Sequence, residues 1–389
     1  MKYHIYNVIL IQILPGCKKR PISPKMHKGQ VTIKDIAKEL GISPSTVSRA
    51  LKDHPDISAY TKKAVQELAL KWNYKPDPIA LSLKSRKSKI IGVIIPEMVH
   101  YFFSTVISGI EDLANDSGYH VMVCQSNENY DREVKNTQAL LSCRVDGILV
   151  SFSKRTFDFE HLKTIQESGV PMVFFDRICD EIVADKVIVD DFEGAYQAVK
   201  HLISIGCKRI AHLASHQHLI IAQNRQEGYI KALSDHNVPV DEQIIVKCDI
   251  IPEANEIIPK LLNLPNPPDG FFAVNDLTAA ETMKIVKSKG LNVPEDIAIV
   301  GFTNAQFSNL TNPTLSSVEQ HGYEIGKNAV RLLLDRIEKE KEYPVQTKII
   351  KTELVIKGSS MRKKKNELKK VISHWFCQMK NISTGTKKI

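Results

Sequence analysis

The chain has 389 residues, of which 43% are apolar and 25% are charged, and its formal net charge is +9. This length predicts two or three domains, and the apolar fraction excludes a chain that is disordered throughout. A basic total suggests a polyanionic partner, so the distribution of the charge along the chain decides what it means.

The positive charge is concentrated at the two ends. Residues 1–30 carry a net charge of +6, residues 31–90 carry another +6 and residues 361–389 carry +8, whereas residues 91–360 carry −11. A basic segment in front of an acidic body is where a nucleic-acid-binding module is expected.

Residues 1–29 are expected to be an extension that is disordered or not native, with Met26 a candidate start. The apolar run Val8–Leu14 is too short to span a bilayer, and a basic cluster follows it, which is the wrong order for a secretory signal. We therefore expect a cytoplasmic, nucleoid-associated protein without membrane contact. The seven scattered cysteines contain no C-x-x-C pair and are expected to be reduced. Residues 361–389 are expected to form a solvated basic tail.

Residues 30–75 are predicted to form three short helices. Thr32 is a suitable N-cap for the first, and Gly41 ends it. Ser43 caps the second helix, with Pro44 in its first position. The third helix is predicted to run from about residue 58 or 60 to Trp72.

Two short helices joined by a tight glycine turn are typical of a helix-turn-helix. Small polar residues occupy the N-terminal end of the second helix, with Arg49 beyond them, and such an end would allow the helix to enter a major groove. A three-helix bundle with a purely structural role is the alternative, although such a bundle would accept Glu or Lys at these positions equally well.

Two stretches of this segment carry a resemblance: TIKDIAKELGISPSTVSRALK and NYKPDPIALSLKS. They resemble the lac-repressor/galactose-repressor family of bacterial transcription regulators, and the similarity extends over roughly residues 29–360. In that family the second helix reads the major groove. The resemblance implies base or phosphate contacts from Thr32, Ser43, Pro44, Ser45, Thr46, Ser48 and Arg49.

Residues 76–89 are a candidate hinge. The resemblance implies that a short helix forms here only on operator DNA, with Leu83 as an apolar wedge between minor-groove base steps and Ala80 and Lys84 beside it. A plain linker is the alternative.

From Ile90 onward, ten apolar runs alternate with amphipathic helical stretches. This pattern predicts an α/β body with parallel sheets covered on both faces, and ten strands fit two doubly wound subdomains better than one sheet. The resemblance implies a body similar to a periplasmic sugar-binding protein. We expect subdomain one to span 90–189 and 319–350, and subdomain two to span 190–318 and 351–360.

Candidate effector-binding residues lie where the strands end, at the expected cleft between the subdomains. They are Tyr101, Phe102, Ser151, Ser153, Asp176, Arg177, Asn275, Asp276 and Thr303. The resemblance adds Arg225, in QNRQEGY, which matches the family arginine that holds effector oxygens. Asp276 could instead cap a helix, and Arg225 could form a salt bridge between the subdomains. Thr303 stands where family members commonly carry an aspartate, a loss that would make a phosphorylated or acidic effector more compatible.

The sequence contains no nucleotide-binding, hydrolase or zinc-protease motif, and His216 and His218 are expected to lie on a loop rim rather than in a metal site. A solute-binding protein or an α/β enzyme using the same cleft remain as alternatives. The sequence favours a transcription repressor, a homodimer or possibly a tetramer, without catalytic activity, metal or cofactor. Its expected partners are double-stranded operator DNA and a small effector, a sugar or sugar derivative.

Overall fold

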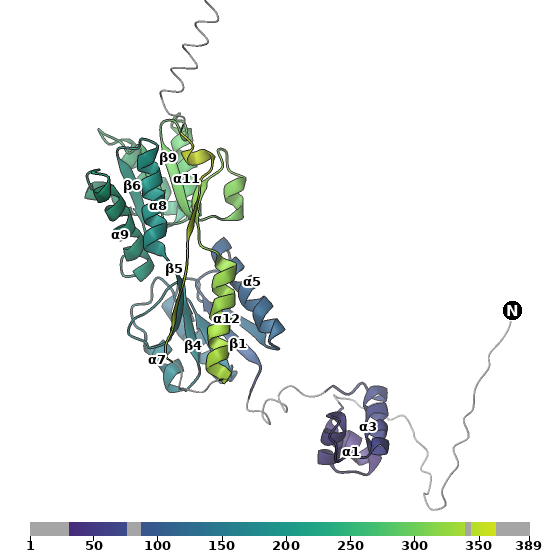
Figure 1. The fold of residues 1–389 in the computed structure, drawn as a ribbon. Coiled ribbons are helices and arrows are strands. Elements are labelled where there is room, and N and C mark those ends of the chain that lie inside the picture. Colours follow the sequence, from purple (N-terminus) through teal and green to yellow (C-terminus); the bar gives the residue numbers. More distant parts are fainter. Residues whose placement is uncertain (1–30, 76–86, 339–343, 363–389) are drawn as a thin grey trace, which may run out of the picture. The chain divides into compact units, whose positions relative to one another are not determined.

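The computed structural model describes residues 31–75, 87–338 and 344–362 (Figure 1). The chain divides into two compact units, Met1–Arg86 and Lys87–Ile389. The expectations for the N-terminal extension, for Ala80, Leu83 and Lys84 of the hinge and for the tail beyond residue 362 lie outside the described residues.

The described part of the N-terminal unit, residues 31–75, contains three helices, as the sequence predicts. They are α1 (Ile33–Leu40), α2 (Pro44–Leu51) and α3 (Ala59–Lys71). Thr32 and Asp35 form a capping box at the start of α1, and Gly41 ends it with a left-handed φ of 65°. Six buried side chains hold the helices together: Ile36, Ala37, Val47, Ala50, Val65 and Ala69.

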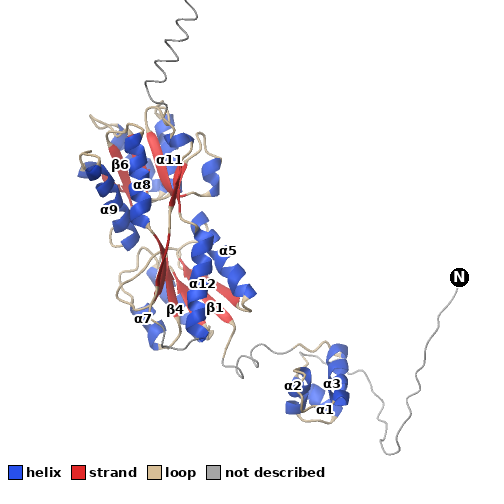
Figure 2. Ribbon diagram, in the orientation of Figure 1, coloured by secondary structure: helices blue, strands red, loops and turns tan. Residues whose placement is uncertain are grey.

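The body contains two six-stranded sheets. The first has the strand order β11-β5-β4-β3-β1-β2 and the second has the order β12-β10-β9-β8-β6-β7. All adjacent strands are parallel except β10 and β12, which pair antiparallel. Two parallel sheets with helices on both faces confirm the predicted pair of doubly wound subdomains (Figure 2).

Subdomain one is built on the first sheet, with α5 and α12 packed on one face and α6 and α7 on the other. Its strands are β1 (Ile90–Ile95), β2 (His120–Gln125), β3 (Gly147–Val150), β4 (Met172–Phe175), β5 (Asp185–Val189) and β11 (Thr347–Ile350). Its helices are α5 (Tyr101–Asp116), α6 (Tyr130–Ser142), α7 (Glu160–Glu167) and α12 (Gly322–Glu338).

Subdomain two is built on the second sheet, with α8 and α9 on one face and α10 and α11 on the other. Its strands are β6 (Ile210–Ala214), β7 (Ile245–Lys247), β8 (Gly270–Ala273), β9 (Ala298–Thr303), β10 (Ser316–Glu319) and β12 (Glu353–Val355). Its helices are α8 (Asp191–Ser204), α9 (Ile220–Asp235), α10 (Ile251–Leu262) and α11 (Asp276–Ser288), with 3-10 turns at Glu242–Ile244, Gln306–Asn309 and Gly358–Ser360.

The chain passes between the subdomains three times. It leaves the first sheet after β5 to enter α8, returns from β10 to α12, and crosses again from β11 to β12. In Figure 1 this last segment, yellow-green to yellow, runs alongside β5 from one sheet to the other. All three crossings start or end on β5, β11, β10 or β12, so the connection lies at one edge of each sheet.

Two features of the body differ from the sequence expectation. The short strands β11 and β12 were not among the ten predicted, because they are exposed edge strands without a continuous apolar run. Arg362, assigned to a solvated tail, instead packs on the body, where its guanidinium donates to the carbonyl oxygens of Asp269 and Asp296 (2.8 Å each). Within the described residues, no helix has the length and apolar character that a membrane span requires.

Candidate functional site

The first turn of α2 presents a cluster of hydroxyl groups. Ser43 Oγ accepts a hydrogen bond from the backbone N–H of Thr46 (3.1 Å), and it lies 2.7 Å from Ser45 Oγ and 2.9 Å from Thr46 Oγ1. Pro44 contributes no N–H to this turn, and the N–H of Val47 donates to the Ser43 carbonyl oxygen (3.1 Å). The turn therefore offers a group of hydroxyl groups at the start of a helix.

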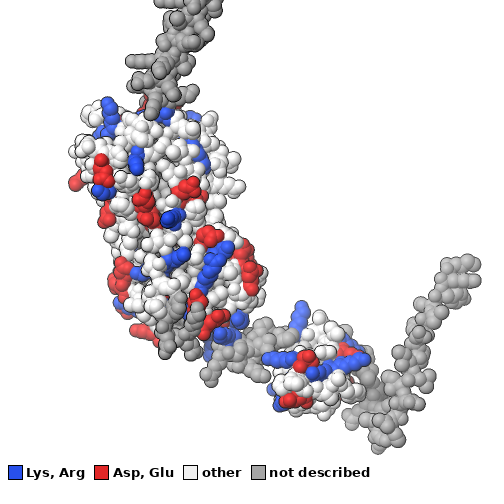
Figure 3. Space-filling view, in the orientation of Figure 1, with Lys and Arg blue, Asp and Glu red and all other residues white. Residues whose placement is uncertain are grey.

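The side chains predicted to contact DNA all lie outside the core of the helical unit. Ser43, Pro44, Ser45 and Arg49 are exposed, and Thr46 and Ser48 are half-buried. Thr32 lies at the start of α1, where its hydroxyl bonds Asp35 (2.7 Å), so the structure gives it a capping role. On the face shown in Figure 3, Lys and Arg side chains cross the helical unit with some Asp and Glu side chains among them, and the body also shows both signs of charge.

In subdomain one, the residues that follow β3 and β4 form one hydrogen-bonded cluster. Ser151 Oγ donates to Asp176 Oδ2 (3.4 Å), and Arg177 forms a two-pronged pair with Glu128 (2.8 and 3.0 Å). The backbone N–H of Ser153 donates to Glu133 (2.5 Å). Ser151, Ser153, Asp176 and Arg177, which the sequence suggested separately, are thus brought together at one end of the sheet.

The pKa of Asp176 is also influenced by a charged residue of subdomain two. Asp176 follows β4 with a left-handed φ of 61°. Burial raises the pKa of Asp176, and the guanidinium groups of Arg177 and Arg225 partly oppose that rise. Arg225 lies on α9 of subdomain two, so the pKa of Asp176 is influenced by a positive charge of the other subdomain.

Arg225 is buried and fully engaged within subdomain two. Its guanidinium lies 2.7 Å from Asp191 Oδ1, donates to the carbonyl oxygen of Val274 (2.8 Å) and stacks 3.8 Å from the ring centre of Phe302. Asp191 is on α8, so the salt bridge proposed as an alternative exists but joins two helices of one subdomain. Burial raises the pKa of Asp191 to about 6 against the opposing charge of Arg225.

The other five candidates line a small cavity between the subdomains. This cavity of about 110 Å³ is lined by Val99, His100, Tyr101, Phe102, Asn275, Asp276, Leu277, Thr303, Ala305 and Phe307. The first four belong to subdomain one and the others to subdomain two. Tyr101, Phe102, Asn275, Asp276 and Thr303 therefore meet in space, in a place separate from the Asp176 cluster.

Three of these cavity residues have structural partners. Asn275 is the N-cap of α11, accepting from Thr278 N (2.8 Å). Asp276 is in the first turn of the same helix and accepts from Ala305 N (2.6 Å) and Ser317 Oγ (2.5 Å), while burial raises its pKa to about 6. Thr303 Oγ1 donates to Gln320 (3.0 Å). Asp276 therefore braces the cavity wall rather than capping the helix.

Four acidic residues of the cleft were missed from sequence, namely Glu128, Glu133, Asp191 and Asp249. Each is the partner of a predicted residue or of its neighbour, and each comes from a distant part of the chain. Asp191 follows Asp190 at the end of an apolar run, a local pattern that does not indicate Arg225 as its partner.

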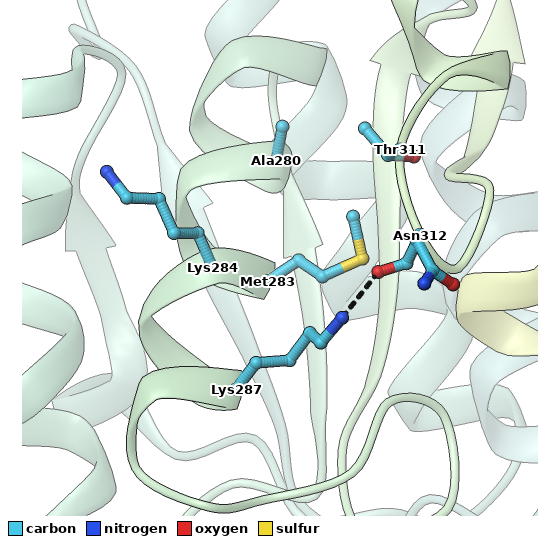
Figure 4. A pocket seen from close by; sticks show the side chains of 6 residues that line it. All are labelled: Ala280, Met283, Lys284, Lys287, Thr311 and Asn312. Atoms are coloured by element: carbon cyan, nitrogen blue, oxygen red, sulfur yellow. Dashed lines mark hydrogen bonds between the residues drawn. The ribbon is translucent and has the colours of Figure 1, made fainter.

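A second hollow lies on the surface of subdomain two. It has a volume of about 310 Å³ and is lined by Ala280, Met283, Lys284, Lys287, Thr311 and Asn312. Figure 4 shows Met283 beside Asn312, and Lys287 Nζ donating to the Asn312 carbonyl oxygen (2.8 Å), whereas Lys284 points away from them. None of the strand-end candidates lines this hollow. In the described residues, no three His, Cys, Asp or Glu side chains are grouped to hold a metal.

Comparison with known proteins addresses both units. A family described as bacterial regulatory proteins, lacI family, matches residues 32–77, and a periplasmic binding protein-like domain matches residues 199–360. The transcriptional repressor CytR of Escherichia coli K12 is 32% identical over 337 residues, covering 86% of this chain and 98% of the relative. The chain belongs to the LacI family.

Other LacI-family proteins agree with this assignment. The ribose operon repressor of Halalkalibacterium halodurans is 33% identical over 334 residues, with 85% of this chain and 98% of the relative covered. The solved complex of the transcriptional regulator CelR with cellobiose is 25% identical, covers 85% of this chain and 100% of that one, and superposes with a TM-score of 0.65. The matched residues include both α2 and the cleft, so this LacI-family chain contains the two parts of a regulator.

Proposed function

We propose that this LacI-family chain is a cytoplasmic transcription repressor that binds operator DNA as a homodimer and has no catalytic role. The observation that carries the proposal is the exposed surface of α2, where the hydroxyl groups of its first turn and Arg49 of its last turn lie on a helix that a major groove can admit. A two-fold dimer would place two such helices on successive half-sites of a pseudo-palindromic operator.

Selection of full-length protein on random duplex DNA tests this proposal. We expect recovered sequences to share two related half-sites in inverted orientation. Arg49→Ala should reduce affinity for the selected site by about tenfold or more, since one good bidentate base contact is worth about 1–3 kcal/mol. Gln66→Ala, on the exposed surface of α3, is the matched control and should bind as the wild type does. Recovery of no enriched sequence would contradict sequence-specific recognition.

The cleft supports a small, uncharged and hydroxyl-rich effector. Three cationic side chains of the cleft already have carboxylate partners: Lys154 with Asp249, Arg177 with Glu128, and Arg225 with Asp191. A phosphate would have to compete with those carboxylates and would bring unbalanced negative charge into a buried site. A neutral effector differs from the acidic or phosphorylated one expected from Thr303, and it agrees with the cellobiose complex of CelR.

A thermal-shift screen of the full chain separates the two effector classes. Matched pairs of sugars or nucleosides and their phosphate esters should show stabilisation by the neutral member, because a ligand at 100 times its Kd stabilises the folded state by about 2.7 kcal/mol. Stabilisation only by the phosphate esters would contradict the proposal. Any compound that stabilises the protein should then change its affinity for the selected DNA site.

A further inference from the structure

The two subdomains contact each other through an ion pair and a ring contact. Neither contact involves the segments that connect the subdomains or the residues that line the small cavity. Lys154 Nζ of subdomain one lies 3.3 Å from Asp249 Oδ2 of subdomain two, and both side chains are largely buried. Beside this pair, the ring of Phe157 stacks against that of His218 with 4.4 Å between their centres. We refer to these four residues as the clasp.

We infer that the clasp, through the Lys154–Asp249 pair, holds the cleft closed and so controls access to the effector site. This inference rests on the proposed function, because it assigns the regulation of the same cleft. The two loops that carry Lys154 and Asp249 are held in place, they lie away from the connections between the subdomains, and Asp249 keeps other partners when the pair opens. We call these loops the two arms of the clasp.

The arm from subdomain one is fixed by buried carboxylates. Lys154 follows β3, and its backbone N–H donates to Glu128 (2.7 Å). Glu133, which is fully buried, accepts from the N–H of Ser153 (2.5 Å) and from the hydroxyl of Thr156 (2.9 Å). Pinned on both sides of Lys154, the loop cannot easily follow Asp249 if the subdomains separate.

The arm from subdomain two is fixed in the same way. Asp249 follows β7, accepts a hydrogen bond from Ser215 Oγ (2.7 Å), and donates its own backbone N–H to Glu253 (3.0 Å). Because hydrogen bonds hold the backbone of both loops, the ion pair forms at one relative position of the subdomains and is lost at others. A short-range contact between two rigid bodies behaves as a two-state element.

The clasp is displaced from the connections between the subdomains. The three crossings involve β5 and β11 at one edge of the first sheet and β10 and β12 at one edge of the second. The clasp comes from the loop after β3 in the first sheet, and from the loops after β6 and β7, the two strands at the opposite edge of the second. A contact away from the hinge axis separates most when the cleft opens.

Opening the clasp would not leave Asp249 without partners. Its carboxylate keeps the hydrogen bond from Ser215, and Lys247 Nζ of its own subdomain lies 3.7 Å away. The charge of Asp249 thus remains partly balanced in both states, which is the condition for a reversible contact rather than a permanent one. Lys154 is half-buried and would gain solvent.

The test measures the distance between the subdomains in the full chain, without DNA or effector. Non-natural residues carrying dyes by click chemistry would replace Glu167 on α7 and Lys260 on α10, both exposed, so the native cysteines are not used. We expect Lys154→Met and Asp249→Asn each to lower the ratio of closed to open molecules by about fivefold, as for a pair worth about 1 kcal/mol. Lys231→Met, which breaks an exposed pair within α9, is the control and should leave the distance unchanged.

The double variant distinguishes a pair from two independent effects. Lys154→Met with Asp249→Asn should open the cleft no further than the more affected single variant, whereas additive opening would overturn the inference. An unchanged distance distribution in both single variants, with wild-type circular dichroism, would also overturn it while leaving the proposed function intact. Conversely, failure to select any DNA site would reject the proposed function and leave the clasp unaffected.

Discussion

At the scale of single residues, the cleft is a set of buried charges that compensate one another. Arg225 shows the principle: its guanidinium is only 8% exposed and it meets Asp191, which is 2% exposed. Removing water from two such groups costs free energy that only a close pair with further hydrogen bonds recovers. The pair therefore orders the site, and each partner becomes harmful when the other is absent.

An alanine substitution at Arg225 would therefore affect folding as well as the effector site. Arg225→Ala leaves Asp191 buried and uncompensated, so we expect the free energy of unfolding to fall by about 3 kcal/mol. The double variant Arg225→Ala with Asp191→Ala should recover part of that loss. Urea unfolding followed by far-UV circular dichroism measures the unfolding free energies of both variants. Additive losses in the double variant would show that the two residues do not act as a pair, and effector response is best compared in the double variant.

A buried histidine predicts a dependence of stability on pH. His212 is fully buried between the rings of Tyr229 and Phe272, and burial lowers its pKa from 6.5 to about 4. Because the folded state binds the proton more weakly than the unfolded chain, its contribution to stability is complete above pH 6.5 and is lost as the pH falls toward 4. We expect the free energy of unfolding to fall by about 2 kcal/mol because of this residue as the pH is lowered from about 7 to about 4.5.

Denaturant unfolding of His212→Phe against wild type isolates that contribution. The difference in unfolding free energy between the two proteins should shift in favour of the variant by about 2 kcal/mol on acidification. His120, which is exposed at the start of β2, provides the control, and its alanine variant should follow the wild-type curve. A constant difference between His212→Phe and wild type would show that His212 does not resist protonation.

At the scale of helices and strands, local signals predicted more than distant pairing did. The caps at Thr32 and Ser43 and the turn at Gly41 act within a few residues, and the helices begin and end beside them. The ten apolar runs became strands because burial on both faces needs apolar residues throughout. Strands β11 and β12 escaped prediction because partners at a sheet edge, not their own apolar residues, define them.

The site was less predictable for the same reason. Strand ends indicated which residues reach the cleft, since the carboxyl ends of parallel strands meet at one edge. They did not indicate the partners: Lys154 and Asp249 are 95 residues apart, and Arg177 and Glu128 are 49 apart. Such pairs depend on how two sheets face each other, which no local pattern specifies.

The contact between α5 and α12 is the closest helix crossing in subdomain one and predicts a steric effect. A Cβ atom at Gly326 would lie 2.1 Å from the Val106 carbonyl oxygen, and one at Gly109 would lie 2.1 Å from that of Tyr323. Gly326→Ala must push the helices apart, and we expect it to lower the free energy of unfolding by about 1–3 kcal/mol despite the higher helix propensity of alanine. Denaturant unfolding checks this, with the exposed Glu324→Ala on α12 as control. A neutral or stabilising Gly326→Ala would contradict the tight crossing.

At the scale of the whole molecule, the net charge of +9 conceals two opposed parts. Residues 31–90 carry +6, whereas residues 91–360 carry −11. DNA phosphates attract the first and repel the second, so the charge arrangement favours approach by the helical unit. An acidic body also reduces nonspecific adhesion of the effector-binding part to nucleic acid.

This arrangement predicts how DNA affinity depends on salt. Each phosphate neutralised by Lys or Arg releases counterions, so the logarithm of the association constant should fall linearly with the logarithm of the salt concentration. With about 6–10 phosphate contacts in a dimer, affinity should fall by about 10³–10⁵ between 50 and 200 mM salt. Lys52 is exposed just after α2. Lys52→Ala should reduce the slope of this salt dependence by about one for each subunit whose Lys52 contacts DNA. Lys231→Ala, on the acidic body, should leave the slope unchanged. A slope altered equally by both substitutions would mean that the body shares the DNA contact, contrary to the charge division.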